Sequence, residues 1–149
     1  MKFLCFSDLH RDVIAAKRIV ALSSAADIVI GAGDFATRRK GVEDTIQILA
    51  EIDKPSVLVP GNGESVQELE SAVEVVGWSS ASVLHGTGCT VAGMAIWGVG
   101  GGIPVTPFGD WSYDFPKIKR SPCLRVVKET LCWWFIRRHW ILLITIVAG

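Results

Sequence analysis

Carboxylate, imidazole and amide side chains directly follow three apolar runs of the sequence. They occur in the segments Asp8-Leu9-His10, Gly33-Asp34 and Gly61-Asn62. Asp8 and His10 are separated by one residue, so in an extended segment both side chains point to the same side. Carboxylates and imidazoles together form a ligand set that suits Mn, Fe or Zn. These residues therefore predict a metal site, provided that the fold brings the three segments together.

The elements that must position these residues alternate between strand and helix along the chain. Apolar runs predict strands over 2–6, 27–30 and 56–59, and helical spacing predicts helices over 11–25, 42–52 and 65–76. This succession predicts an α/β fold with a parallel sheet and right-handed crossovers. The three segments would then lie at the carboxyl ends of neighbouring strands, where open α/β sheets bind their ligands.

Two further patterns refine this expectation. Ser65 fits the N-cap of the third helix, and Glu68 completes a capping box with it. After that helix come short strand-like pieces separated by glycines, over 82–84, 90–91 and 95–99. They predict hairpins or a second sheet.

The second segment also allows a different interpretation. Gly31-x-Gly33-x-x-Ala36 after a strand matches a dinucleotide-binding fingerprint. In such a site the helix begins within the glycine loop, so that its amides face the pyrophosphate. Here residues 37–41 come before the helix, and the fingerprint leaves Asp8, His10 and Asn62 unexplained. A nucleotide-binding domain is therefore the lower-ranked hypothesis.

In this order and at these intervals, Asp8-x-His10, Gly33-Asp34 and Gly61-Asn62 resemble the first three motifs of the calcineurin-like metallophosphoesterases. The resemblance covers roughly residues 1–116 and implies an αββα sandwich around two divalent metal ions, Mn, Fe or Zn. It implies that Asp8 and His10 bind the first metal, Asn62 binds the second, and Asp34 bridges both. The implied activity is hydrolysis of a phosphate ester, with Asp34 and Asn62 as the catalytic candidates.

Two neighbours of these motifs have supporting roles in the same hypothesis. Glu64 keeps the acidic position of the third motif and is expected to support the metal ligands from behind. Arg38 opens a basic run after the second motif. It is a candidate for steering the phosphate group of the substrate, although a solvated basic turn is the commoner role of such a run.

The sequence departs from the family pattern in two places. Gly63 stands where the family has a histidine that acts on the phosphate or on the leaving group. The later Gly-His-x-His motif has no match, because the three histidines of the chain are His10, His85 and His139. We therefore expect an incomplete C-terminal half, weakened metal binding and impaired activity. A non-catalytic binding or scaffold domain on the same fold is the alternative.

Charge divides the chain near Pro116. Residues 1–116 carry 8 Lys/Arg and 14 Asp/Glu, whereas residues 117–149 carry 7 Lys/Arg and only Glu129. The zero net charge of the whole chain gives no sign of a nucleic-acid surface. We expect a phosphoesterase-like domain over 1–116 and an atypical basic and hydrophobic tail over 117–149.

The tail allows two explanations. It is out of frame or truncated relative to a longer ancestor, or it associates with a membrane. A spanning helix ranks low, because the apolar run 140–148 is far shorter than the roughly 20 residues that span a bilayer. Association with the membrane interface ranks somewhat higher, and a poorly packed hydrophobic tail ranks highest. The four cysteines form no C-x-x-C pair, and no signal peptide is evident at the start of the sequence, which predicts a cytoplasmic protein.

Overall fold

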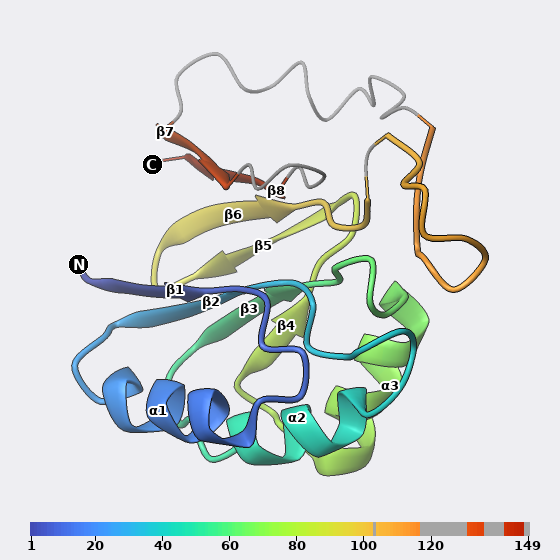
Figure 1. The fold of residues 1–149 in the computed structure, drawn as a ribbon. Coiled ribbons are helices and arrows are strands. Elements are labelled where there is room, and N and C mark those ends of the chain that lie inside the picture. The colour runs from blue at the N-terminus through green and yellow to red at the C-terminus, as the bar shows by residue number, and fades with distance from the viewer. Residues whose placement is uncertain (103, 117–130, 136–141, 148–149) are drawn as a thin grey trace.

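The computed structural model describes residues 1–102, 104–116, 131–135 and 142–147. These residues form three layers (Figure 1): a layer of helices, a parallel sheet that the helices cover on one face, and a second sheet on the opposite side. One helical layer and both sheets of the expected αββα sandwich are thus present.

The first sheet contains four parallel strands in the order β1-β2-β3-β4. Their bounds are Phe3–Phe6 for β1, Ile28–Ala32 for β2, Ser56–Val59 for β3 and Ala81–Val83 for β4. Strand β3 is buried along its whole length, and so is β2 up to Gly31. This explains their continuous apolar sequence, because a strand between two covered faces needs apolar side chains on both. Strand β4 pairs in parallel with β3, so the segment predicted over 82–84 belongs to this sheet and not to a hairpin or a second sheet.

Three helices cross over between these strands. They are α1 (Val13–Ser23), α2 (Val42–Leu49) and α3 (Val66–Val76). The predicted capping box is confirmed at α3, where Ser65 and Glu68 exchange side-chain to backbone hydrogen bonds, and Gly77 ends the helix in a left-handed conformation. Helix α1 begins later than predicted, because Asp12 is its N-cap and accepts from the amides of Ile14 and Ala15.

The second sheet is antiparallel, in the order β5-β6-β8-β7. Strands β5 (Thr87–Val91) and β6 (Met94–Gly98) form the expected hairpin. Strand β8 (Leu142–Val147) pairs with β6 and with β7 (Leu131–Phe135). Two segments of the predicted tail thus lie in this sheet, and the remainder of the tail, with His139, lies outside the described residues.

Two hydrophobic clusters hold the layers together. The larger one packs the helices on the first sheet and includes Phe35, Ile46, Leu58 and Leu69. The smaller one lies between the sheets and joins residues of β2 and β3 to Ile96 of β6. Strands β2 and β3 are thus fixed from both faces, which gives the loops that follow them a rigid base.

The described residues contain no helix that is long and apolar enough to cross a membrane. Three expectations stay predictions: that the tail is out of frame or truncated, that it associates with a membrane, and that the protein is cytoplasmic.

Candidate metal centre

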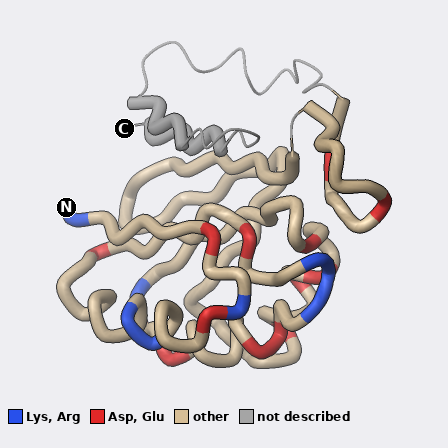
Figure 2. The backbone as a smooth tube through the Cα atoms, viewed as in Figure 1, with Lys and Arg blue, Asp and Glu red and all other residues tan. Residues whose placement is uncertain are grey.

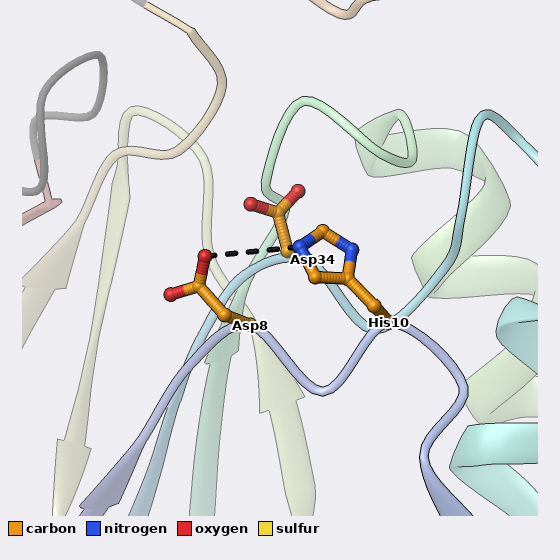
Figure 3. Close-up of side chains that lie close together, drawn as sticks. All are labelled: Asp8, His10 and Asp34. Atoms are coloured by element: carbon orange, nitrogen blue, oxygen red, sulfur yellow. Dashed lines mark ion pairs between the residues drawn. The ribbon is translucent and has the colours of Figure 1, made fainter.

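The three predicted segments meet at the carboxyl edge of the first sheet. Asp8 follows β1, Asp34 follows β2 and Asn62 follows β3, and these strands are direct neighbours. One ligand atom each of Asp8, His10 and Asp34 can be chosen so that all three lie within 4.8 Å of one another. Figure 3 shows the three side chains converging from the two loops. The distance between His10 Nε2 and Asp8 Oδ1 is 3.8 Å.

Main-chain hydrogen bonds hold the loop after β1 against the loop after β2. The amide of Asp8 donates to Gly33 O (3.1 Å), that of His10 to Asp34 O (2.8 Å), and that of Arg11 to Phe35 O (3.2 Å). The distance between the Asp8–His10 pair and Asp34 is therefore set by the backbone and not by side-chain rotamers alone.

Both loops contain non-glycine residues in the left-handed region of backbone space. Apart from Ala92, the described non-glycine residues of positive φ are Asp8, His10, Arg11, Asp34, Arg38 and Arg39. Such conformations cost of order 1 kcal/mol each and cluster at functional sites, where the surrounding structure enforces them. The φ values of 56° at Asp8, 45° at His10 and 59° at Asp34 show that the candidate ligands lie in a strained part of the backbone.

A backbone carbonyl orients the imidazole of His10. Nδ1 lies 3.1 Å from Ala36 O. A carbonyl only accepts hydrogen bonds, so Nδ1 carries a proton, and Nε2, on the side of Asp8, is the ring nitrogen that faces the cluster. Metal-binding histidines are held in this way, with the second ring nitrogen donating to a fixed acceptor.

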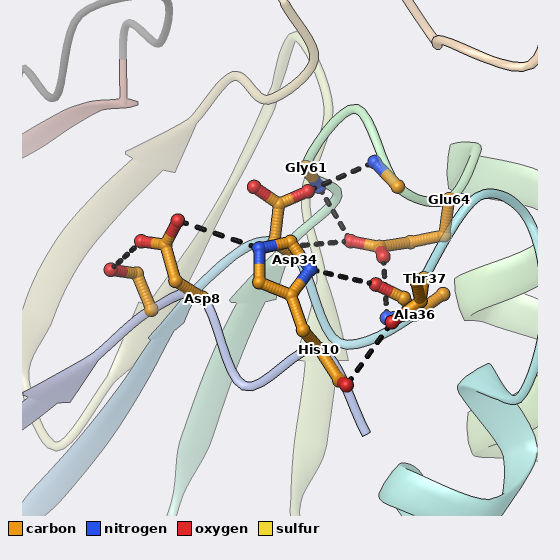
Figure 4. A network of polar contacts seen from close by, with 9 residues as sticks. Asp8, His10, Asp34, Ala36, Thr37, Gly61 and Glu64 are labelled. Carbon is orange, nitrogen blue, oxygen red and sulfur yellow. Dashed lines mark hydrogen bonds and ion pairs between the residues drawn. The ribbon is translucent and has the colours of Figure 1, made fainter. Parts of the chain in front are cut away.

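Glu64 connects the loops after β2 and β3 from behind (Figure 4). Its carboxyl group is fully buried and accepts from the amides of Gly61 (2.6 Å), Asp34 (2.9 Å) and Ala36 (2.9 Å). Burial raises the pKa of Glu64 to about 7, although these backbone donors oppose the shift. Glu64 thus lies where the sequence hypothesis expected a support for the ligands.

Asp34 is the buried carboxylate of the cluster, with 4% of its surface exposed. Burial raises the pKa of Asp34, against the hydrogen bond from the Gly63 amide to Oδ1 (2.9 Å) and the attraction of His10. A carboxylate without a cation is disfavoured in such a place, and a divalent cation would compensate for the lost hydration.

Asn62 is 2% exposed, and only the nitrogen of its side-chain amide has a hydrogen-bond partner among the described residues. Its Nδ2 donates to Ser112 Oγ, and its backbone carbonyl accepts from the amide of Tyr113 (3.0 Å). Within the described part of the chain no group donates to Asn62 Oδ1. A buried amide oxygen without a donor is rare, and a cation at this edge would satisfy it. Together with two carboxylates and an imidazole, this oxygen completes a donor set that fits a divalent metal.

The model of the calcineurin-like phosphoesterase superfamily domain matches residues 1–96. The chain belongs to this superfamily. No curated protein matches the chain. The crystal structure of TT1561 of Thermus thermophilus has the same fold, with a TM-score of 0.66 at 22% sequence identity over 76% of this chain. A second solved structure gives a TM-score of 0.58 at 14% identity over 77% of this chain.

The chain spans little more than half the length of these two solved structures, namely 56% of the first and 59% of the second. The family match lies within the range of the sequence resemblance and carries all four predicted metal ligands.

A cavity of about 450 Å³ opens in front of the candidate ligands of this calcineurin-like domain. Its lining includes the four candidate ligands Asp8, His10, Asp34 and Asn62, together with Arg38, Phe108 and Trp111. The Arg38 guanidinium carbon lies 5.8 Å from the centre of the Trp111 ring, and Phe108 stacks on that ring with 5.7 Å between centroids. Arg38 belongs to the continuous basic stretch in the β2–α2 loop, which Figure 2 shows in blue.

The sequence did not single out Ser112 or Trp111 as residues of the site. The aromatic run around Trp111 was the available signal, but it did not show that the ring borders the cavity. Among the described residues, His85 does not belong to the cluster of candidate ligands. Its ring packs against Tyr113 and Phe115, and its Nδ1 accepts from the Gly100 amide.

Proposed function

We propose that this protein is a metal-dependent hydrolase of phosphate esters. The convergence of Asp8, His10 and Asp34 within 4.8 Å at one wall of a cavity carries the proposal, and superfamily membership supports it. Asp8 and His10 would hold one metal ion, Asn62 a second, and Asp34 both. Mn, Fe and Zn each suit this donor set.

In this proposal, residues around the ligands hold them in place and attract the substrate. Ala36 holds the His10 ring with Nε2 available as a ligand, and Glu64 fixes the loops that carry Asp34 and Asn62. Arg38 brings a positive charge to the cavity, where it attracts the phosphate of the substrate. When bound, the metal ions supply Lewis acidity, which polarises the phosphoryl group and activates water.

Protonation of the leaving group is the weak point of this site. Gly63 supplies no imidazole, and general acid catalysis is often worth about two to four powers of ten. We therefore expect activity mainly on esters whose leaving groups depart without a proton.

A specific observation favours the second candidate, a non-catalytic binding domain. A Cβ atom at Gly63 would lie 2.8 Å from Ala36 O and 3.1 Å from Asp34 Oδ1. The space that a histidine would need is therefore closed, which suits a chain whose site binds a ligand without turning it over.

Mn²⁺-dependent hydrolysis of bis-p-nitrophenyl phosphate tests the proposal, because its leaving group needs no general acid. We expect Asp34→Asn to lose at least about 100-fold in activity, since even residues behind a metal ligand are worth 10–100-fold. Asp53→Asn, at an exposed position outside the site, serves as the matched control. Hydrolysis that persists in Asp34→Asn would show that another site is responsible. A folded wild-type protein that binds Mn²⁺ without turnover would favour the binding domain.

A further inference from the structure

The side-chain amide of Asn62 is tied to a segment that follows it by about fifty residues. Asn62 Nδ2 contacts Ser112 Oγ, and Ser112 Oγ lies 2.8 Å from Asp114 Oδ1. The other oxygen of Asp114 accepts from the amide (2.8 Å) and the hydroxyl (2.6 Å) of Thr106. Asn62, Ser112 and Asp114 thus form a chain of hydrogen bonds.

Counting protons along this chain fixes the direction of each hydrogen bond. Thr106 Oγ1 also lies 3.0 Å from Ser112 Oγ, but it gives its own proton to Asp114 Oδ2. A carboxylate only accepts, so Asp114 Oδ1 takes the single hydroxyl proton of Ser112. Ser112 must then accept from Asn62, and only the NH₂ group of the amide can donate. With the amide turned over, Asn62 Oδ1 and Asp114 would both present oxygen to a hydroxyl that has one proton. Asp114 therefore determines, through Ser112, which end of the Asn62 amide faces away from Ser112.

We propose that Ser112 is a positioning residue that, with Asp114, holds the Asn62 amide with Oδ1 available to a divalent cation. The inference rests on the proposed function, because it assigns a purpose to Asn62 as a ligand. An amide turned the other way would present its NH₂ group to the cation and repel it. Partners that orient a ligand in this manner typically contribute 10–100-fold to metal affinity.

The segment does not need the Ser112 hydroxyl for its own attachment. Main-chain hydrogen bonds already hold it, from Gly102 N to Tyr113 O (2.9 Å), from Phe115 N to Gly102 O (2.8 Å) and from Tyr113 N to Asn62 O (3.0 Å). Thr106 also holds Asp114 through its amide and its hydroxyl, and its amide does so without contact with Ser112. The hydroxyl is thus the group that transmits the charge of Asp114 to the amide of Asn62.

Isothermal titration of the full chain with Mn²⁺ tests the inference without any assay of turnover. We expect Ser112→Ala to weaken Mn²⁺ binding about 10–100-fold and Ser112→Thr, which keeps the hydroxyl, to bind like the wild type. The double variant Ser112→Ala/Asn62→Ala should bind no more weakly than Asn62→Ala, because Ser112 acts through Asn62. Ser24→Ala, at an exposed position at the end of α1, is the control. Thermal unfolding without metal monitors the fold of each variant.

Each alternative result has a separate meaning. Wild-type affinity in Ser112→Ala, or losses that add in the double variant, would overturn the positioning role while leaving the metal site intact. Failure of Ser112→Thr to restore binding would also overturn it, because the hydroxyl would then not be the group that acts. Absence of Mn²⁺ binding in the folded wild type would remove the proposed metal centre, and the positioning role with it.

Discussion

Gly63 shows how a single residue constrains this site. It lies between Asn62 and Glu64, where a Cβ atom would come within 2.8 Å of a backbone carbonyl oxygen. We expect Gly63→Ala to lower the free energy of unfolding by about 1–3 kcal/mol, the usual cost of overpacking a closed site. Urea denaturation followed by circular dichroism measures this change.

The same crowding predicts that Gly63→His does not recover the function of the missing imidazole, because the backbone around Asp34 must move to admit it. A Gly63→Ala variant as stable as the wild type would contradict this argument, since the loops after β2 and β3 would then adjust freely.

The four metal-ligand candidates illustrate which residues a sequence reveals. Asp8, Asp34 and Asn62 were predicted to meet because parallel strands place their carboxyl ends at one edge, a property of backbone topology. Ser112 was not found, because its contact with Asn62 depends on the path of a loop that no periodicity describes. The three backbone hydrogen bonds of Glu64 were hidden for the same reason.

At the scale of elements, an ion pair joins the loop after β2 to helix α3. Arg39 Nε lies 2.7 Å from Glu68 Oε2, and about a third of each side chain is exposed. Burial opposes ionisation of Glu68, but the hydrogen bond and charge of Arg39 and the contacts with Ser65 outweigh it and hold the pKa of Glu68 below its usual value. A carboxylate of lowered pKa stabilises the folded state above its ordinary pKa, and this contribution is lost as the pH falls through the folded-state value.

We therefore expect Glu68→Gln to destabilise the protein by about 0.2–1 kcal/mol at pH 7, the range of partly exposed ion pairs. Glutamine keeps the capping box, so this loss reports mainly the charge. The difference from the wild type should shrink towards acid pH, where Glu68 itself becomes neutral. Thermal unfolding between pH 7 and pH 3 measures it, with Glu70→Gln on the same helix as control. A difference that stays constant over this range would mean that the charge of Glu68 is not involved.

The elements themselves were predicted better than their ends. Apolar runs located β1, β2 and β3, and the capping box located the start of α3. Buried strands and helix caps require particular residue types at adjacent positions, which the sequence shows directly. Helix α1 starts at Val13 and not at Arg11, since Arg11 has a φ of 67° and still belongs to the strained loop. Apolar spacing does not distinguish such a residue from the first turn of a helix.

At the scale of the whole molecule, the expected division into domain and tail depends on long-range pairing. Local composition changes sharply near Pro116, yet β8 pairs with β6 at Ala95, Ile96 and Trp97. Pairing between residues about fifty positions apart leaves no local signal, so the sequence alone indicated only a hydrophobic tail. The separation of residues 117–149 as a unit stays a prediction.

The proposed metal centre also links the stability of the whole fold to Mn²⁺. The ligands come from the ends of β1, β2 and β3, so the site exists only when the sheet is formed, and the ion binds the folded state alone. At a free Mn²⁺ concentration about 100 times the dissociation constant, this linkage is worth about 2.7 kcal/mol. We expect the unfolding temperature to rise by roughly 5–10 °C for a chain of this size.

Asp34→Asn should abolish this rise, whereas Asp53→Asn should retain it. Because burial raises the pKa of Asp34, the metal-free Asp34→Asn protein should unfold at the same temperature as the metal-free wild type or at a higher one. The loss of the Mn²⁺ effect then cannot be attributed to a damaged fold. Differential scanning calorimetry with Mn²⁺ and with excess chelator measures all three proteins. An equal rise in Asp34→Asn and the wild type would show that the ion binds elsewhere, because Asp34 is the proposed ligand of both metal positions.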